Sequence, residues 1–334
     1  MKIDRQELLK ALSALRPGLA KKDIVEQATH FVFIKDKIIT YNDQICIMYP
    51  FDTGFECSVK ADEFYKILSS MTDAEVELIS EENKLILNSG SVKSGFTAST
   101  DRYVIELVEQ MDIPGEWIRL PGDFIEGLSF CIFSVSKDVS RRILSCINVS
   151  GDQIVSSDDN RISQYTMASP VEDSLLIQGS AVLELIKFNI KEYVRGQSWI
   201  YFKTEDGVVF ASRTIEGEYP DASEFFDFEF TRFRLPDNLK QAVEMVSIFA
   251  EGDFDIDKKI EVIVQDGKIK CKGEKEIGWA ETETDIKLKS EEAIKFAINP
   301  LFFSQILDHT TTICCGKDRA MFTTKNFKHL LSLF

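Results

Sequence analysis

The sequence is poor in the residues that build most catalytic and metal centres. It contains no HExxH pair, no His/Cys ligand spacing and no G-x-S-x-G nucleophile motif. We therefore expect no catalytic residues, no bound metal and no cofactor. The few histidines lie far apart in the chain, at His30, His309 and His329.

Long apolar runs are also missing. No stretch approaches the roughly 20 apolar residues that a membrane-spanning helix needs, and the opening MKIDRQELLK is charged where a secretory signal is apolar. The seven cysteines are odd in number, lack any CxxC spacing and mostly lie in apolar, strand-like runs. These features predict a cytoplasmic protein with no membrane partner, whose cysteines act as small buried hydrophobic residues.

Basic residues are scarce relative to acidic ones. There are 39 lysines and arginines against 55 aspartates and glutamates, a formal net charge of −16. A protein that coats nucleic acid in general must neutralise many phosphates, so this balance argues against that class. The balance is an average, however, and basic residues gathered on one concave surface still allow an acidic protein to hold DNA there.

What the chain does have is length and an internal repeat. Its 334 residues, 44% hydrophobic and 28% charged, suggest two or three folded domains. One order of elements occurs three times at a period of about 115 residues: an amphipathic helix, a hairpin, a strand leading into a second helix, and a second hairpin. The expected opening helices span 5–15, 123–135 and 236–250, and the first hairpins span 31–41, 146–157 and 260–271. The second helices are expected within 55–71, 174–189 and 295–310. The last hairpins are expected to turn at 82–83, 206–207 and 317–318.

The repeat predicts an α+β protein of three similar domains in tandem, with limits at 1–113, 114–226 and 227–334. Each domain should place two helices on an antiparallel sheet of about eight strands. The alternative is a generic α+β protein with accidental periodicity.

Three segments carry a resemblance to a known family. The bacterial sliding clamps, the beta subunits of DNA polymerase III, usually show R-P-I-L-x-G-V, T-D-G-H-R-L and G-x-F/Y-P-D-Y in this order. Here the corresponding residues read RRIL at 141–144, SDDNRI at 157–162 and GEYPDA at 217–222. With the triple layout and an apolar C-terminal end, the chain resembles a divergent member of that family.

The resemblance implies a non-catalytic subunit of a DNA polymerase holoenzyme with three domains of the DNA-clamp type. Two copies would close head to tail into a ring that encircles duplex DNA without sequence specificity. The ring would tether DNA polymerase, the clamp loader and repair proteins. Two alternatives stay open: a clamp-fold interaction scaffold that no longer tethers to DNA, and an enzyme on an unfamiliar repeat fold, with Asp158, Arg161 and Asp221 as its polar candidates.

The resemblance also implies a hydrophobic pocket between the second and third domains that captures short partner peptides. For Leu144, Ile162, Leu331 and Leu333 the alternative is plain core packing, whereas Arg161, a basic residue in an apolar segment, needs a partner or a ligand. The matching positions are Leu144, Ser157, Asp159, Asn160, Arg161, Ile162, Pro220, Phe225, Leu331 and Leu333.

A ring around DNA predicts inner helices that are less acidic than the outer sheets. The helical segments together carry slightly more basic than acidic residues, and the rest of the chain is strongly acidic. Lys187, Lys191 and Arg195 are four residues apart, which predicts a basic stripe on one helix face, although any single charge could equally mark a solvated face. The residues expected to face DNA are Lys10, Arg16, Lys21, Lys22, Arg141, Arg142, Lys187, Lys191 and Arg195.

Overall fold

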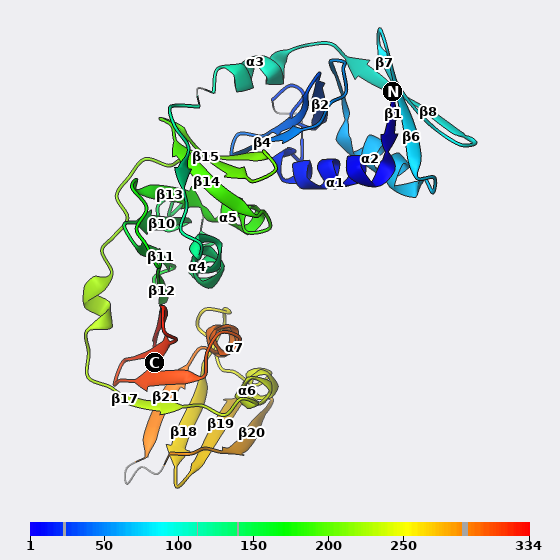
Figure 1. Ribbon diagram of the computed structural model, residues 1–334. Helices are drawn as coiled ribbons and strands as arrows, with labels where there is room; N and C mark the ends of the chain where they lie inside the picture. The colour runs from blue at the N-terminus through cyan, green and yellow to red at the C-terminus, as the bar shows by residue number, and fades with distance from the viewer. Residues whose placement is uncertain (23–24, 112, 139, 289–292) are drawn as a thin grey trace. The chain divides into compact units, whose positions relative to one another are not determined.

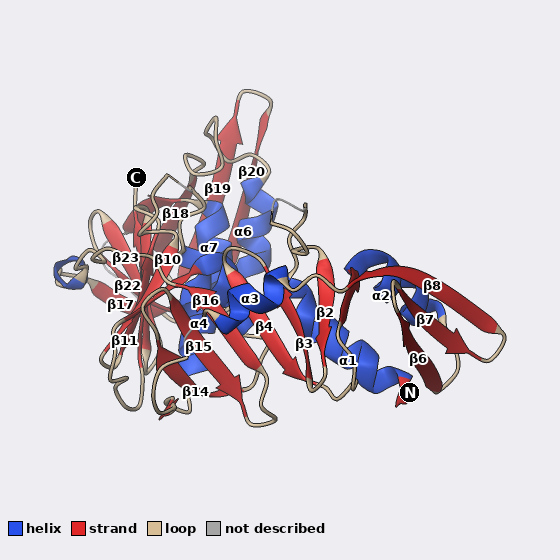
Figure 2. Cartoon of the chain, turned by 90° about the horizontal axis from the view of Figure 1, so that it is seen from above, coloured by secondary structure: helices blue, strands red, loops and turns tan. Residues whose placement is uncertain are grey.

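The computed structural model describes residues 1–334 except 23–24, 112, 139 and 289–292. The described residues form seven α-helices and three antiparallel sheets, so the α+β prediction is confirmed (Figures 1 and 2). The chain divides into two compact units, which are described separately. The first unit is Met1–Gly122 with Ser180–Glu216, and the second is Asp123–Gly179 with Gly217–Phe334.

A twelve-stranded sheet forms the first unit. Helices α1 (Arg5–Leu15) and α2 (Ala61–Ser70) pack together, α3 (Tyr103–Glu109) covers the sheet elsewhere, and α5 (Gly179–Leu185) begins at the unit boundary. In spatial order the strands are β1 (Lys2–Asp4), β6 (Glu75–Glu81), β7 (Lys84–Ser89), β8 (Val92–Ser99), β5 (Cys57–Lys60), β2 (His30–Ile34), β3 (Lys37–Tyr41), β4 (Ile45–Pro50), β16 (Val209–Arg213), β15 (Trp199–Thr204), β14 (Ile190–Arg195) and β9 (Ile118–Arg119).

Helix α1 shows how local sequence signals determine where an element begins and ends. The carboxylate of Asp4 caps the helix by accepting a hydrogen bond from the Glu7 amide at 2.9 Å. Leu8, Leu12 and Leu15 form a buried stripe, and the chain then leaves the helix through a short 3₁₀ turn. The helix therefore has the limits that the sequence predicted.

The second unit contains an eight-stranded and a four-stranded sheet. Helices α6 (Leu239–Ser247) and α7 (Pro300–Leu307) lie side by side, and α6 covers β19 and β20 (Figure 1). Helix α4 (Phe124–Cys131), continued by the 3₁₀ turn η2 (Ile132–Ser134), lies on β11 and β12. The two sheets are β13 (Leu175–Gln178), β10 (Cys146–Ser150), β11 (Gln153–Ser157), β12 (Arg161–Thr166), β24 (Phe327–Ser332), β23 (Arg319–Thr323), β22 (Thr312–Cys315) and β17 (Thr231–Arg234), and then β20 (Gly278–Asp285), β19 (Lys268–Lys275), β18 (Ile260–Gln265) and β21 (Ile294–Ile298).

The hairpins turn where the sequence predicted. Asp266 and Gly267 between β18 and β19 have φ angles of 51° and 75°, the pair of left-handed residues that a tight two-residue hairpin requires. The repeats then join edge to edge, because β4 pairs with β16 and β12 pairs with β24, both antiparallel. Sheets thus extend across repeats, and each last strand of a repeat completes the sheet of the repeat before it. The domain limits at 1–113, 114–226 and 227–334 stay a prediction.

One helix prediction is wrong. Helix α5 ends at Leu185, so Lys187 follows it, and Lys191 and Arg195 lie on strand β14. These three residues therefore do not form a stripe on one helix face, although all three side chains are exposed. A spacing of four residues fits about one helix period and two strand periods alike. The segment is a strand because β14 pairs with β15 and β9.

The cysteines behave as the sequence predicted. All seven are free and buried, and burial raises the pKa of Cys46 and Cys57 to about 12 and that of Cys146 to about 11. Their thiolates are therefore disfavoured at neutral pH. Among the described helices, none combines the length and the apolar character that crossing a bilayer takes.

Candidate functional site

A pocket in the second unit lies where β12 and β24 meet, and we call it the β12–β24 pocket. Its volume is about 330 Å³, and its walls come from the turn before β10, the β11–β12 turn, the segment 219–225, the start of β23 and the end of β24. Among the predicted pocket residues, those that line it are Leu144, Ser157, Asp159, Asn160, Arg161, Ile162, Pro220 and Phe225.

The floor of the β12–β24 pocket is apolar. Ile162 pairs directly with Leu330 across the two strands, and both side chains pack with Met321 in one buried cluster. Phe225, on the 3₁₀ turn η3 (Ser223–Phe226), remains 50% exposed at the mouth. An aromatic or leucine side chain entering from solvent would meet apolar surface on several sides.

Strand alternation explains which predicted residues lie elsewhere. Leu330 and Ser332 of β24 line the pocket, whereas Leu331 is 1% exposed and Leu333 is not among the lining residues. Since successive side chains of a strand point to opposite faces, Leu331 packs into the core on the other side of the sheet. The plain core-packing alternative therefore describes Leu331.

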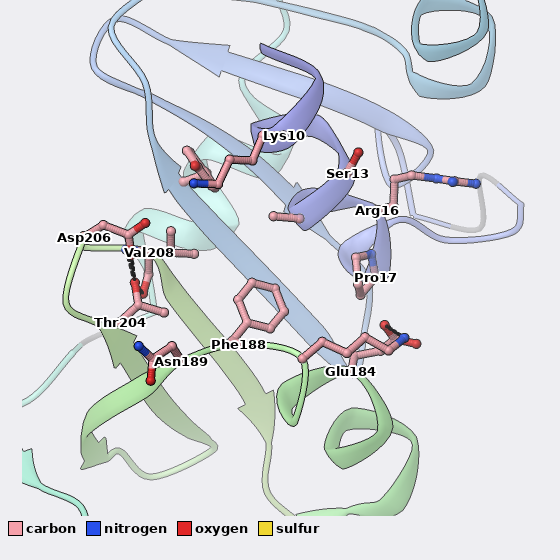
Figure 3. Close-up of a pocket in the computed structure, with 13 residues that line it drawn as sticks. Lys10, Ser13, Arg16, Pro17, Glu184, Phe188, Asn189, Thr204, Asp206 and Val208 are labelled. Atoms are coloured by element: carbon pink, nitrogen blue, oxygen red, sulfur yellow. Dashed lines mark hydrogen bonds and ion pairs between the residues drawn. The ribbon is translucent and has the colours of Figure 1, made fainter. Parts of the chain in front are cut away.

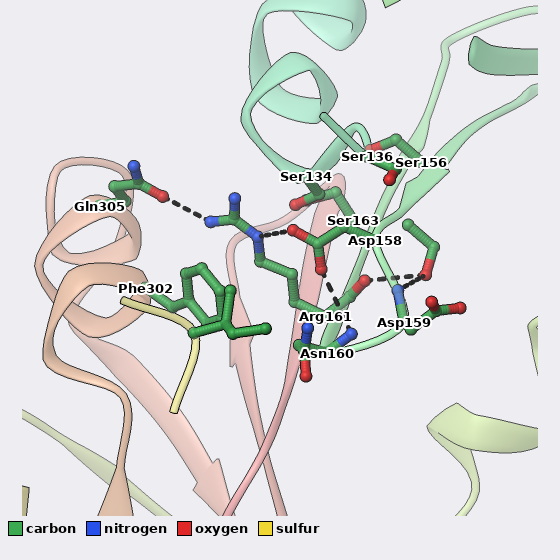
Figure 4. Close-up of polar contacts among 12 residues, drawn as sticks. Ser134, Ser136, Ser156, Asp158, Asp159, Asn160, Arg161, Ser163, Phe302 and Gln305 are labelled. Carbon is green, nitrogen blue, oxygen red and sulfur yellow. Dashed lines mark hydrogen bonds and ion pairs between the residues drawn. The ribbon is translucent and has the colours of Figure 1, made fainter. Parts of the chain in front are cut away.

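Arg161 has the partner that the sequence analysis required. Its guanidinium donates to Asp158 at 2.9 Å and to the side-chain oxygen of Gln305 on α7, and it lies 4.1 Å from the ring centroid of Phe302 (Figure 4). The side chain is 4% exposed, and desolvation lowers its pKa while Asp158 opposes that shift. Because it alternates with Ile162, its charge lies on the helix side of the sheet rather than over the apolar floor.

Three carboxylates stand around the pocket mouth. Asp159, whose φ is 73°, forms an ion pair with Arg141, and Asp318 pairs with Arg319 at 2.9 Å. Asp221 accepts hydrogen bonds from the backbone and hydroxyl of Ser223, which lower the pKa of its carboxyl group. Arg141, which the sequence analysis expected to face DNA, therefore reaches the rim of this pocket.

Sequence reasoning missed several lining residues. Tyr219, Asp221 and Ala222 follow from their place in the GEYPDA segment, and Leu330 and Ser332 follow from strand alternation near the C-terminal end. Asp318 and Arg319 depend on which strands become neighbours, which no local pattern encodes. The missed residues are Tyr219, Asp221, Ala222, Asp318, Arg319, Leu330 and Ser332.

A separate basic surface lies in the first unit. Lys10, Arg16 and Lys187 line one hollow of about 690 Å³ between α1 and the end of α5 (Figure 3). Lys187 forms an ion pair with Glu184 at 2.7 Å, which reduces its free charge. Arg16 also borders a neighbouring hollow whose lining includes Lys21 and Lys22. Within this unit the structure thus gathers five of the residues that were expected to face DNA.

The remaining basic residues are more scattered. Lys191 and Arg195 are exposed on β14, and Arg142 is exposed in the turn before β10. On α6 and α7 the single basic side chain is Lys240, and it pairs with Asp308 at 2.6 Å and with Glu244 at 3.7 Å. The surface of these two helices therefore carries little free positive charge.

A buried polar cluster lies under α4 in the second unit. The Nδ1 atom of His329 is 2.8 Å from the hydroxyl of Ser163, and Ser163 is 2.7 Å from the hydroxyl of Ser134. The Nε2 atom of His329 is buried, and no described residue forms a hydrogen bond with it. Desolvation, with the nearby charges of Arg161 and His309, holds the pKa of His329 well below its usual range.

We expect this histidine to make stability depend on pH. His329 stays neutral in the folded protein but binds a proton in the unfolded chain below about pH 6.5, so stability is complete above that pH and falls as the solution becomes more acidic. One proton of difference corresponds to about 1.4 kcal/mol per pH unit. Urea unfolding between pH 7.5 and 5.5 measures the slope, and His329→Leu should reduce it.

A variant of His309 serves as the control for that measurement. Its pKa is also lowered by burial, although Asp308 acts in the opposite direction, so His309 contributes a smaller slope of the same sign. The His309→Gln variant should keep most of the pH dependence. An unchanged slope in His329→Leu would contradict the assignment.

Comparisons with known proteins identify the fold. No model of a protein family matches the chain, and no curated protein matches it in sequence. Among solved structures it is similar to the DNA polymerase III beta chain of Streptococcus pneumoniae, with 18% identity and a TM-score of 0.84 over 100% of this chain and 98% of that one. The beta subunit of Streptococcus pyogenes gives 19% and 0.84 over 100% and 99%.

A third solved structure carries a ligand. The Helicobacter pylori beta clamp bound to a DNA ligase peptide matches with 18% identity and a TM-score of 0.82 over 100% of this chain and 99% of that one. At these identities the likeness establishes the fold and not the activity. The chain therefore has the sliding-clamp fold along its whole length, as the resemblance implied.

Proposed function

We propose that this chain is a divergent member of the bacterial sliding-clamp family: a non-catalytic processivity factor that encircles duplex DNA and tethers replication and repair proteins. The observation that supports it best is the β12–β24 pocket, an apolar hollow on a clamp fold, lined by residues that the resemblance had named. Acting on bacterial DNA, such a protein would work in the cytoplasm. Catalysis has no part in this mechanism, which is topological.

The pocket supports a peptide ligand rather than a substrate. Its volume suits one or two side chains. Its floor is Ile162 and Leu330, Leu144 adds a further apolar lining residue, and its mouth is open between Phe225 and the carboxylates. Short extended peptides bind such hollows through apolar anchors and are oriented by polar groups at the rim. Tethering through the peptide would raise the local concentration of polymerase at the primer end.

Phe225→Ala is expected to weaken binding of the cognate polymerase tail about tenfold. Half of this ring is exposed at the mouth, so its removal takes away contact area for the ligand while leaving the core intact. Leu333→Ala is the matched control, because Leu333 is only half-buried and does not line the pocket. Fluorescence anisotropy with a labelled tail peptide measures the affinity of both variants. An equal loss of affinity in the two variants would show that the tail does not bind in this pocket.

Ring closure follows from how the repeats already join. In both junctions within the chain, the strand that follows the first hairpin of one repeat pairs with the last strand of the next: β4 with β16, and β12 with β24. The corresponding strands left over are β20 in the third repeat and β8 in the first. β20 ends its sheet, and β8 pairs with β5 only at Ser99 and Ala98. The same rule therefore joins β20 of one copy to β8 of a second copy.

Apolar side chains beside β20 support this assembly. Met245 and Ile248 at the end of α6 are 54% and 66% exposed, and Trp279 on β20 is 64% exposed. A monomer would leave this patch in water, whereas a head-to-tail dimer would cover it. Two copies joined at two such contacts make a closed ring of six repeats and leave neither β8 nor β20 as a free edge.

A topological trap tests the proposed function. The protein is diluted to dissociate it, reassembled in the presence of a nicked circular plasmid, and passed through a gel-filtration column in 0.5 M salt. We expect it to elute with the circle and to be released once a restriction enzyme linearises the DNA, because only a ring can slide off an end. High salt suppresses ordinary phosphate binding, so retention on linear DNA of the same length would contradict encirclement.

The scaffold alternative rests on one specific observation. Lys240, the single basic residue on α6 and α7, is already engaged by Asp308 and Glu244, so these helices offer DNA little positive charge. A scaffold would bind the partner tail normally and elute free of the circle. The two assays together therefore separate a clamp from a scaffold.

A further inference from the structure

The hollow between α1 and the end of α5 is aromatic as well as basic, and we call it the α1–α5 hollow. Its volume of about 690 Å³ lies within the range of small-ligand pockets. The ring of Phe188 stands inside it, between Pro17 of the 3₁₀ turn η1 (Arg16–Gly18) and Val208 of the β15–β16 turn (Figure 3). Tyr49 on β4 adds a second ring to the lining.

The second unit repeats the backbone frame of this hollow. The turn η1 follows α1 as η2 follows α4. Three residues before each turn a serine hydroxyl donates to the carbonyl four residues earlier, at 2.6 Å for Ser13 and 2.8 Å for Ser129. At the ends of β16 and β24 the amides of Arg213 and Ser332 donate to the carbonyls just before β4 and β12, at 2.9 and 3.1 Å. Each position of the hollow therefore has a counterpart in the second unit.

Three side chains of the hollow stand where the second unit has phenylalanine. Counted from these matched hydrogen bonds, the pairs are Ala14 and Phe130, Pro17 and Phe133, and Val208 and Phe327. In the second unit the three rings pack together, with the Phe327 centroid 4.8 Å from that of Phe130 and 6.5 Å from that of Phe133. The first unit keeps the frame with smaller side chains, which leaves room for the hollow.

Tyr49 lacks the stacking partner of its counterpart. It lies on β4 at the position that Tyr165 occupies on β12, five residues beyond the matched carbonyl. Tyr165 stacks with Phe130, with the centroids 5.7 Å apart and 29° between the planes. The first repeat has Ala14 in place of Phe130, and among the described residues no ring lies against Tyr49.

Phe188 has also lost a partner. The amides of Phe188 and His309 each donate to the carbonyl three residues earlier, at 3.0 and 2.9 Å, which makes the two residues counterparts. His309 stacks with Phe133, with 9° between the planes, whereas Pro17 takes that place in the first repeat. The contact of Phe188 with Phe210 is T-shaped, and Phe188 is half-buried, so part of its ring is open to a planar ligand.

Lys10 supplies free charge at the rim of the hollow. It is exposed, no described residue forms an ion pair with it, and it stands where the second repeat has Glu126. The two carboxylates in the lining are both engaged: Glu184 pairs with Lys187, and Asp206 accepts a hydrogen bond from a threonine hydroxyl of its own turn. A phosphate at this rim can therefore approach a lysine that no described carboxylate holds.

We propose that the α1–α5 hollow binds an unpaired base of single-stranded DNA, with the base against Phe188 and Tyr49 and its phosphate near Lys10. Rings beside a basic side chain suit single strands of any sequence, because every base has a flat face. In the second unit the chain's own rings take the equivalent space. The inference rests on the proposed function, since a clamp on DNA would hold the single strand beside its duplex within reach of this surface.

Fluorinated tyrosine can report on this hollow separately from other sites. Tyr49 lines the α1–α5 hollow, Tyr165 lies in its filled counterpart, and Tyr219 lines the β12–β24 pocket. The full chain, labelled with 3-fluorotyrosine, is titrated with a thymidine tetranucleotide at low ionic strength and followed by ¹⁹F NMR. The control strand has the same length and charge but carries no bases.

We expect the thymidine strand to shift Tyr49 but not Tyr165 or Tyr219. It should bind about tenfold more tightly than the strand without bases, because only the stacking contact distinguishes them. No shift at Tyr49, or equal binding of the two strands, would overturn the proposal. A Tyr49 shift with the polymerase tail peptide and none with the thymidine strand would make the hollow a peptide site instead.

Variants test the filling of the hollow directly. Ala14→Phe restores the ring that the second repeat has in this place and should abolish the Tyr49 response, whereas Ser69→Phe, at an exposed position of α2 outside the hollow, should not. Lys10→Glu should weaken both strands alike, because it acts on the phosphate. Wild-type binding in Ala14→Phe would contradict the site. The titration needs no closed ring and the plasmid trap needs no hollow, so each can fail without the other.

Discussion

Replacing Arg161 by alanine is expected to lower the free energy of unfolding by about 3 kcal/mol, because it removes one member of a buried charged pair. Asp158, whose side chain is 15% exposed, would lose its ion-pair partner, and Gln305 would lose its donor. The rings of Phe133 and Phe302 would also lose the guanidinium that packs on them. Urea unfolding of the purified chain measures the change.

Two further variants show whether burial is the cause. Arg141→Ala breaks an ion pair between side chains about half exposed, and such pairs contribute about 0.5 kcal/mol or less. Arg161→Lys keeps the charge but loses the planar fork, so it should fall between the wild type and Arg161→Ala. Similar losses in Arg161→Ala and Arg141→Ala would show that the Arg161 contacts contribute no more than surface contacts.

The second large effect concerns assembly. Met245→Glu combined with Ile248→Glu is expected to raise the dimer dissociation constant at least a hundredfold and to abolish retention on circular DNA. Both side chains are more than half exposed at the end of α6, beside the edge strand β20, so the change places charge in the proposed contact without disturbing the core. Analytical ultracentrifugation over a concentration series measures the dissociation constant.

A matched substitution guards against a general effect of added charge. Leu183 on α5 is 52% exposed and lies on neither of the strands proposed to pair. Leu183→Glu should leave the dimer intact, and all variants should bind the polymerase tail with unchanged affinity. If the double variant dimerises like the wild type, the contact lies elsewhere.

Much of the fold could be predicted because its signals are local. The Asp4 cap, the buried stripe of α1 and the Asp266-Gly267 turn each depend on only a few neighbouring residues. Because the pattern of elements occurs three times in the sequence, each predicted element can be compared with its two counterparts. Helix α3 was missed because its buried residues, Val104, Ile105 and Val108, occupy only two turns, and because its first turn is capped from far along the chain, where the side chain of Gln27 accepts from the Val104 amide at 3.2 Å. Strand β14 was misread because lysines four apart fit helix and strand equally.

The site was predictable where residue type mattered and not where strand pairing did. Ile162 and Phe225, apolar residues that the family resemblance named, both line the β12–β24 pocket. The choice between Leu330 and Leu331 depends on the register of β24 against β12, and a shift of one residue would exchange them. Arg319 enters the pocket only because the third repeat joins the second, a long-range contact without any local signal.

The central claim, that this chain closes into a ring, is tested most directly by negative-stain electron microscopy of the purified protein together with its solution mass at the same micromolar concentration. The account predicts a particle with a central hole and a mass twice the 38.0 kDa of one chain. Monomers, or dimers without a hole, would contradict it.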